Sequence, residues 1–333
     1  MTFNWPQYTD ERLQTLLESQ LSRAPVSHAY VFYGVLGSGK DGVMQTFARA
    51  AQCVGSTRPC GTCVSCTAHE HHVHPDFVDI RSFSQGTPEI TVDMVREFKK
   101  SLMRRPVVTQ SKVGLISHAE RLTLVAANAL LKIFEDPPEH VAIVMSTSHL
   151  RSVPPTLISR CQTIHVRRLT ALTMRALYGA PERNSSDTDQ CLTLANGRIA
   201  IMNDLMHGGL EKYHGRISSI LKMLNLFPNT MWQELDTGFR NQKKASSDGR
   251  IPRNFARELM HDFESVIRDI LVAHIAPSLI RNVQFQSEIQ SLAKRLPPRR
   301  VLLLLRSLFS HREAIEQDSA NAQLHCEYLF LGV

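Results

Sequence analysis

The stretch over residues 29–51 constrains the fold more than any other part of this chain. An apolar run over residues 29–33 is followed by the sequence GVLGSGKD over residues 34–41 and then by a helical pattern over residues 41–51. A glycine-rich turn between a strand and a helix is typical of loops in which backbone N–H groups and the helix amino terminus hold phosphate. The pattern predicts an α/β domain of the phosphate-loop type, in which the contacts to a nucleotide would come from Gly34, Gly37, Gly39, Lys40 and Asp41.

Two features of this region depart from a working hydrolytic site. The residue after the lysine is Asp41, where Ser or Thr would supply a hydroxyl group to magnesium. Hydrolysis also needs an acidic residue at the end of a second strand, yet the apolar run over residues 113–116 ends in Ser117 and His118. We therefore expect weakened or altered binding of ATP or ADP, and no hydrolysis by this chain.

Strand and helix patterns alternate from this loop to about residue 167. The runs that predict strands are rich in β-branched and aromatic residues and lie at residues 29–33, 77–80, 113–116, 141–145 and 163–166. The helical stretches between them lie at residues 41–51, 92–102 and 122–135. Such alternation favours a parallel sheet covered by helices, here over residues 1–167.

Past residue 168 the strand signals fade. Helical patterns over residues 169–177 and 191–206 predict a small helical lid at residues 168–208, and an all-helical domain follows at residues 209–333. One helical face in that domain is formed by Phe255, Leu259, Phe263, Val266 and Ile270. Further helices are predicted over residues 286–295, 298–309 and 321–331, with a polar loop over residues 242–252. A length of 333 residues suits a division into two or three domains.

Four of the seven cysteines stand close together after the first helix of the phosphate loop, at Cys53, Cys60, Cys63 and Cys66. Their spacing can close a tetrahedral site of four thiolates, the arrangement typical of Zn²⁺. Four sulfur ligands leave no open coordination position, so the zinc would be structural. The histidines at positions 69, 71, 72 and 74 are alternative ligands, although a tightly spaced run of histidines is more often solvated.

Several motifs occur together in a fixed order along the chain. After the phosphate loop and the cysteine cluster come His74-Pro75-Asp76, the run ANALLKIFEDPP over residues 127–138, and Ser159-Arg160-Cys161. In this combination the chain resembles bacterial clamp-loader subunits of the AAA+ class. The gamma/tau motor subunits of that family carry an intact hydroxyl residue and an acidic pair, so this chain resembles the non-hydrolysing member.

The resemblance implies a role inside a ring of subunits that works in DNA replication. In this family the Ser-Arg-Cys motif projects its arginine into the nucleotide site of the neighbouring subunit, so Arg160 would be an arginine finger that acts in trans. The implied partners are the gamma/tau motor subunits, the delta subunit, the sliding clamp and, through the assembly, primed DNA. Residues 209–333 would form the collar of the ring, and Thr147, Ser148 and Arg198 fall near the family's sensor positions.

Charge and hydropathy agree with this reading of the motifs. The 38 Lys and Arg residues against 31 Asp and Glu residues leave a net charge of +7, which favours a polyanionic partner. Basic residues gather in two stretches, Lys99, Lys100, Arg104, Arg105 and Lys112, and Lys294, Arg295, Arg299 and Arg300. No apolar run reaches the roughly 18 residues that span a bilayer, so we expect a cytoplasmic protein with no membrane partner.

Two other hypotheses follow from the same residues. An active ATPase would use Asp41 as a magnesium ligand and a further carboxylate such as Glu120 to activate water, and its turnover would depend on Lys40. A zinc-dependent nucleic-acid-binding module would instead bind DNA tightly by itself and lose that binding on the substitution Cys63→Ser.

Overall fold

The computed structural model describes residues 2–22, 27–83, 89–179, 185–225, 253–316 and 325–326. Their packing divides the chain into two compact units. The first comprises Met1–Glu182 with Asn196–Ile201, and the second comprises Arg183–Ala195 with Met202–Val333. The division into three parts at residues 167 and 208 stays a prediction.

The first unit is built on a five-stranded sheet in which every neighbouring pair of strands is parallel. The order across the sheet is β4 (Phe77–Asp79), β5 (Lys112–Ile116), β6 (Val141–Thr147), β2 (Ala29–Tyr33) and β7 (Gln162–His165). All five predicted strands are present, so the predicted parallel α/β fold is confirmed. The strand that leads into the phosphate loop is flanked on both sides, and its first four residues are buried.

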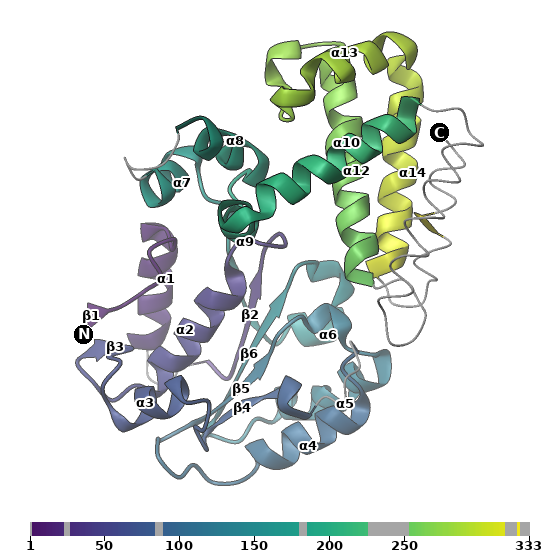
Figure 1. Ribbon diagram of the computed structural model, residues 1–333. Coiled ribbons are helices and arrows are strands. Elements are labelled where there is room, and N and C mark those ends of the chain that lie inside the picture. Colours follow the sequence, from purple (N-terminus) through teal and green to yellow (C-terminus); the bar gives the residue numbers. More distant parts are fainter. Residues whose placement is uncertain are drawn as a thin grey trace. The chain divides into compact units, whose positions relative to one another are not determined.

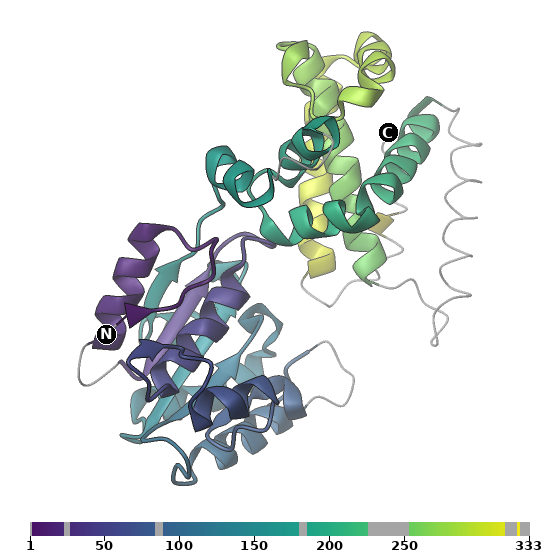
Figure 2. The same ribbon diagram turned by 60° about the vertical axis from the view of Figure 1, so that its left-hand side comes forward.

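Helices cover both faces of this sheet (Figures 1 and 2). One face packs against α1 (Glu11–Ser22) and α2 (Lys40–Gln52), and the other packs against α4 (Val92–Leu102), α5 (Leu124–Glu135) and α6 (Pro155–Ile158). Successive side chains of β2 point to opposite faces, so Tyr30 and Phe32 enter the first core while Ala29 and Val31 enter the second. The phosphate loop is thereby fixed between two apolar layers.

The four cysteines lie in a small module beside the main sheet. After α2 the chain forms β3 (Thr57–Arg58), which pairs in parallel with β1 (Thr2–Phe3), and then α3 (Val64–Glu70). The sequence patterns had indicated none of these short elements. Single turns of 3-10 helix over Ile80–Phe83, Ala119–Arg121 and Leu150–Ser152 follow β4, β5 and β6.

The helix predicted over residues 191–206 is wrong as a single element. The structure has α7 (Ala171–Tyr178), α8 (Ser185–Ala195) and α9 (Ile199–Asp204), with the break between α8 and α9 at Asn196 and Gly197. Both residues have positive φ angles, +48° and +76°, which end a right-handed helix. A Cβ atom at Gly197 would lie 2.3 Å from the Leu169 carbonyl oxygen, so this close approach also requires glycine.

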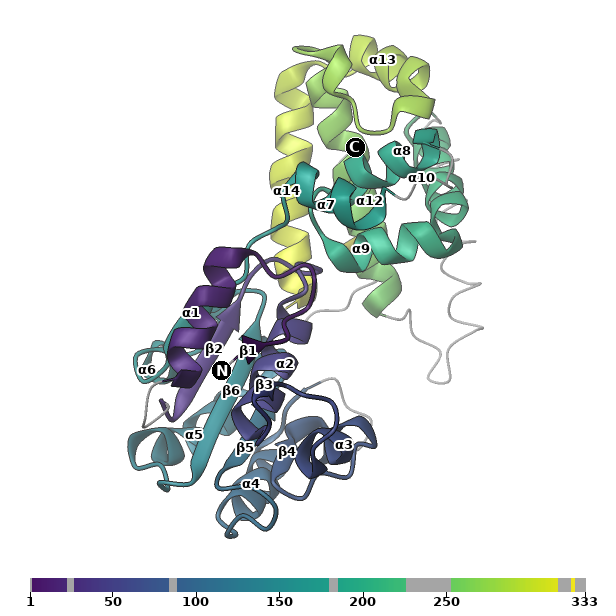
Figure 3. The same ribbon diagram turned by 90° about the vertical axis from the view of Figure 1, so that its left-hand side faces the viewer.

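The second unit is helical. Its main elements are a kinked turn (Leu205–Gly209), α10 (Leu210–Asn225), α12 (Arg253–Ala273), α13 (Gln286–Arg295) and α14 (Pro298–Glu316). The helix α12 packs along α14 (Figures 1 and 3). The predicted apolar face is confirmed for Phe263, Val266 and Ile270, which are fully buried. The described residues do not include the Phe255 side chain or the polar loop predicted at residues 242–252. Of the helix predicted over residues 321–331 they include only residues 325–326, which are helical.

A buried polar cluster joins the helices of the second unit. The Asp269 carboxylate accepts hydrogen bonds from the backbone N–H groups of Arg281 and Asn282, at 3.0 and 2.8 Å, and from the Asn282 side chain. Tyr213 donates its hydroxyl hydrogen to Asn282, and burial raises the pKa of this phenol to about 12. Every helix within the described ranges is too short or too polar to cross a lipid bilayer.

Candidate functional site

The phosphate loop connects β2 to α2. Gly39 stands at the start of α2 with a φ of +86°, a backbone conformation that glycine adopts without strain. Gly37 has a similar positive φ, and its carbonyl oxygen accepts the Ala200 backbone N–H at 3.2 Å. This bond brings the segment that begins at Arg198, a predicted sensor residue, next to the loop.

The lysine of the loop is held inside the chain. The Lys40 side chain is 1% exposed, its Nζ donates to Ser148 Oγ at 3.0 Å, and it lies 3.7 Å from Asp41 Oδ2. The other oxygen of the Asp41 carboxylate accepts a hydrogen bond from the Ser146 hydroxyl group. In a working loop the lysine reaches the outer phosphates, whereas here a carboxylate and a serine at the end of β6 satisfy it.

The end of β5 continues this network instead of presenting an acid. His118 adopts a left-handed conformation with a φ of +58°, and its backbone N–H donates to Ser146 Oγ at 3.1 Å. Glu120 accepts from the His118 ring at 3.3 Å and from the Ser148 backbone N–H at 3.3 Å. Burial alone would raise the pKa of Glu120, but the hydrogen bonds, with His118 first, lower the pKa to about 2. A carboxylate with such a low pKa is a weak general base near neutral pH.

Tyr8 lies against the loop, and no pattern in the sequence had indicated it. A Cβ atom at Gly39 would be 2.8 Å from the Tyr8 ring, and a Cβ atom at Gly42 would be 2.1 Å from its hydroxyl oxygen. Burial, helped by the charge of Asp41, raises the pKa of Tyr8. The aromatic ring thus covers the first turn of α2, where the loop passes into the helix.

The four cysteines come together as their spacing predicted. Their sulfur atoms all lie within 4.8 Å of one another, and two pairs, Cys53 with Cys63 and Cys60 with Cys66, are each 3.9 Å apart. Sulfur atoms bound tetrahedrally to Zn²⁺ at about 2.3 Å are about 3.8 Å apart, so the geometry fits this ion. The four cysteines could therefore hold a structural metal such as zinc.

Hydrogen bonds to the sulfur atoms also fit a thiolate site. The N–H and hydroxyl groups of Thr62, together with the Cys63 N–H, lower the pKa of Cys60 to about 5. Burial raises the pKa of Cys66 to about 12, a penalty that a bound divalent cation would remove. Of the alternative ligands, His69 is hydrogen-bonded to Gln52 and His74 to Ser65, each at 2.9 Å, and neither belongs to the sulfur cluster.

The His-Pro-Asp motif is structural. The Asp76 carboxylate is fully buried and accepts the backbone N–H groups of Val107, Val108 and Thr109 at 2.7–2.8 Å. Burial would raise its pKa, but these bonds lower it. Lys112 is also buried, with Nζ 3.6 Å from Asp76, although it belongs to a basic stretch of the sequence.

Arg160 follows α6 at the surface. Its guanidinium group donates to the Thr156 carbonyl oxygen at 2.8 Å and to Glu135 Oε1 at 2.9 Å. The Arg160 side chain is 36% exposed, so the group is accessible to another molecule. The next residue, Cys161, packs against the apolar core, and burial raises the pKa of its thiol to about 12.

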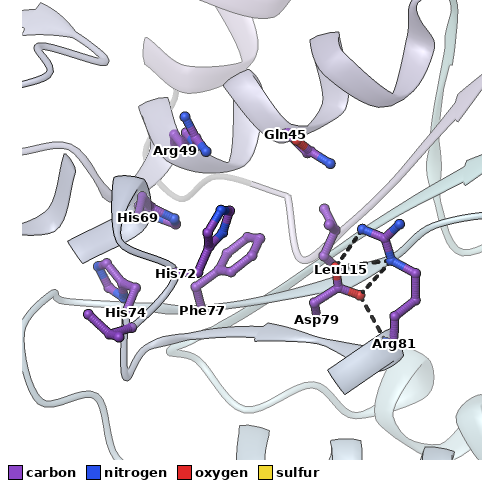
Figure 4. A pocket seen from close by; sticks show the side chains of 10 residues that line it. Gln45, Arg49, His69, His72, His74, Phe77, Asp79, Arg81 and Leu115 are labelled. Atoms are coloured by element: carbon purple, nitrogen blue, oxygen red, sulfur yellow. Dashed lines mark hydrogen bonds and ion pairs between the residues drawn. The ribbon is translucent and has the colours of Figure 1, made fainter. Parts of the chain in front are cut away.

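A cavity of about 690 Å³, lined by both polar and apolar side chains, lies between α2, α3 and β4 (Figure 4). Arg49 and Gln45 line it from α2, while Asp79 and Arg81, which form an ion pair at 2.8 Å, line it from the end of β4 and the following turn. His72 and Phe77 lie between these groups (Figure 4). The lining residues come from separate segments, so no local pattern in the sequence had indicated the cavity.

Comparisons with known proteins match this chain to subunits of DNA polymerase III. The family described as "DNA polymerase III, delta subunit" matches residues 9–170. A DNA polymerase III tau subunit of Bacillus subtilis is 30% identical over 203 residues, which make up 60% of this chain and 34% of that protein. A gamma subunit of Buchnera aphidicola is 26% identical over 330 residues, 92% of this chain and 89% of that one.

The chain spans about a third of the length of the tau relative. Among solved structures, a DNA polymerase III gamma subunit-related protein from Thermotoga maritima aligns with 92% of this chain and with all of its own. It shares 18% sequence identity, and the TM-score is 0.42.

Proposed function

Because this chain belongs to the clamp-loader subunits of DNA polymerase III, as a delta-prime-like AAA+ relative of gamma and tau, we propose that it is the ring's non-hydrolysing delta-prime subunit. In this role it assembles with gamma/tau motor subunits and a delta subunit in the cytoplasm. It helps to load the sliding clamp onto primed DNA and does not synthesise DNA itself.

The observation that carries the proposal is an asymmetry between two sites. The Lys40 ammonium group, which would bind phosphate, is paired within the chain with Asp41 and Ser148. The Arg160 guanidinium group also has a partner, Glu135, but its side chain is 36% exposed, against 1% for Lys40. A permanently charged, planar guanidinium group suits the stabilisation of phosphate charge in a neighbouring site. The chain would thus contribute Arg160 in trans and leave hydrolysis to its partners.

The alternative of an active ATPase has less support. Its general base would be Glu120, whose pKa is lowered to about 2. Its magnesium ligand would be Asp41, which already accepts a hydrogen bond from Ser146 and faces Lys40. A direct test is to measure ATP turnover by the isolated chain. We expect no turnover, and any residual turnover should not depend on Lys40.

The four cysteines fit a structural role in this subunit. With Zn²⁺ bound, Cys53, Cys60, Cys63 and Cys66 would fill all four coordination positions and tie the end of α2 to α3. The metal would cross-link this module and would have no open coordination position for a substrate. Metal analysis of the purified chain should find about one equivalent of zinc.

The proposal is tested in a complex reconstituted with gamma/tau and delta subunits, the sliding clamp and primed DNA. The substitution Arg160→Ala should lower DNA-stimulated ATP turnover severalfold, because the neighbouring site loses its trans-acting cation, and should leave assembly intact. Lys40→Ala should leave turnover at the level of the unchanged complex. Unchanged turnover with Arg160→Ala, or turnover lost with Lys40→Ala, would argue against the proposed role.

A further inference from the structure

The Arg160 guanidinium group is restrained by a carboxylate from a different helix. We propose that Glu135, the last residue of α5, is a positioning residue that orients Arg160 toward the nucleotide of the neighbouring subunit. This inference rests on the proposed function of Arg160. It adds a residue that lies 25 positions earlier in the chain and has no place in the Ser-Arg-Cys motif.

Three hydrogen bonds define the orientation. Arg160 Nη1 donates to the Thr156 carbonyl oxygen at 2.8 Å and, over a longer 3.4 Å, to the Ser159 hydroxyl oxygen. Arg160 Nη2 donates to Glu135 Oε1 at 2.9 Å. The first two contacts come from the same turn of chain as Arg160, so only the bond to Glu135 fixes the guanidinium group relative to another element.

The remaining donors are the ones that a phosphate would need. A guanidinium group has five N–H donors in a fixed planar fork. The three bonds leave the Nε–H and one Nη2–H without a partner among the described residues. Two neighbouring N–H groups in one plane are the arrangement that binds a phosphate in bidentate fashion. Glu135 thus holds the guanidinium group through one Nη2–H and leaves the Nε–H and the second Nη2–H for a phosphate.

The backbone beneath Arg160 is fixed by the core. Leu157 is fully buried, and the Cys161 thiol donates to the Leu157 carbonyl oxygen at 3.1 Å. Ile158 and Cys161 pack against the apolar cluster that also contains the buried residues of α5. The freedom that remains at Arg160 therefore lies in its long side chain, which is the part that Glu135 restrains.

The ion pair itself should matter little for folding. Side-chain exposure is 36% for Arg160 and 52% for Glu135, and exposed ion pairs contribute little to stability. A small displacement of a catalytic group, however, lowers a rate much more than it lowers stability. A change at Glu135 should accordingly appear in turnover and not in unfolding.

The experiment uses the full reconstituted complex with primed DNA and the clamp, and measures kcat and KM for ATP. Glu135→Ala should lower kcat about threefold to fivefold, the range expected for one exposed charged contact, with little change in KM. Glu135→Gln keeps a side-chain oxygen acceptor and should lower kcat less. Glu139→Gln removes an exposed carboxylate from the loop that follows α5, and should leave kcat unchanged.

A double substitution shows whether Glu135 acts through Arg160. If it does, Glu135→Ala combined with Arg160→Ala should have the same kcat as Arg160→Ala alone. Provided that Arg160→Ala still lowers turnover, the inference is overturned by any of three results. These are additive losses in the double variant, an unchanged kcat with Glu135→Ala, or an increased kcat with Glu135→Ala. If Arg160→Ala itself has no effect, the proposed function fails first. Thermal unfolding and size-exclusion profiles equal to those of the unchanged complex confirm that folding and assembly are intact.

Discussion

Asp41 shows how one residue changes the electrostatics of a phosphate loop. A hydroxyl group at this position is neutral and can bind magnesium, whereas the Asp41 carboxylate brings a negative charge within 3.7 Å of Lys40. It satisfies the cation that would otherwise attract phosphate, and it repels phosphate directly. Ser146 holds the carboxylate in place from the end of β6.

Replacing this residue should partly restore the site. We expect Asp41→Thr to raise the affinity of the isolated chain for magnesium-ADP by about tenfold or more, because a like charge is removed from beside the phosphates. Isothermal titration calorimetry measures this change. Asp41→Asn is the control for charge alone and should give a smaller gain, since an amide lacks the hydroxyl ligand. No gain with either variant would show that another group, such as the ring of Tyr8, closes the site.

Glu120 gives the same network a dependence on pH. Its pKa falls from 4.5 to about 2 on folding, so the folded chain binds fewer protons than the unfolded chain between these values. The stability it contributes is present above pH 4.5 and is lost as the pH falls toward 2. Because the Glu120 carboxyl group is largely buried, this contribution to the free energy of unfolding is at most about 3 kcal/mol.

The substitution Glu120→Gln should remove that dependence. Urea unfolding measured from pH 6 to pH 3 should show a shallower loss of stability for this variant than for the unchanged chain. Glu139→Gln, in an exposed position, should follow the unchanged chain. Parallel curves for Glu120→Gln and the unchanged chain would contradict the role of the hydrogen bond from His118.

At the scale of elements, close contacts between backbones fix the phosphate loop to the sheet. The N–H of Gly34 donates to the Thr147 carbonyl oxygen at 3.3 Å, and a Cβ atom at Gly34 would lie 2.2 Å from the Val166 carbonyl oxygen. Since a backbone oxygen between two strands cannot move aside cheaply, the start of the loop depends on glycine here. The loop is therefore tied to both strands that flank β2.

Two glycine substitutions should have opposite effects on stability. Gly34→Ala should destabilise the first unit by about 2 kcal/mol, because the added methyl group overpacks against Val166. Gly215→Ala, inside α10 and with open space around it, should stabilise the second unit by up to about 1 kcal/mol. Chemical denaturation of each variant measures both changes. A neutral result for Gly34→Ala would mean that the loop can shift away from the sheet.

At the scale of the whole molecule, the four-cysteine module belongs to one of two separately packed units. Cys53, Cys60, Cys63 and Cys66 lie in the first unit, together with β1 and β3, while α12 and α14 lie in the second. The binding energy of a structural metal is folding energy for the elements it links. Its loss should therefore be local to the first unit.

Removal of the metal should have a regional effect. After chelation, amide hydrogen exchange should rise by more than about tenfold over residues 53–70 and at Thr2 and Phe3, which pair with β3. Exchange in α12 and α14 should stay the same. The substitution Cys63→Ser should reproduce this pattern, while Cys161→Ala, outside the cluster, should keep the metal content. Equal exchange before and after chelation would contradict a structural role for the metal.

The sequence by itself determined the strands, the phosphate loop and the cluster of four cysteines. Each of these is written in a local pattern: five short apolar runs, a glycine-rich turn and four closely spaced cysteines. Local geometry follows from such patterns because the period of a strand, the reach of a turn and the span of a zinc site all fit within a few residues. The break at Asn196 and Gly197 escaped this reasoning, since the apolar pattern continues across it.

Only the tertiary structure decided which partners the charged side chains of the phosphate loop contact. Lys40 meets Ser148 because β6 lies next to β2, and the pairing of two strands so far apart in the sequence is not encoded in their periodicity. The contact of Glu135 with Arg160 likewise depends on how α5 and α6 pack on the same face of the sheet. Residue type and spacing specify which groups a chain carries, but strand order and helix packing set which of those groups can reach one another.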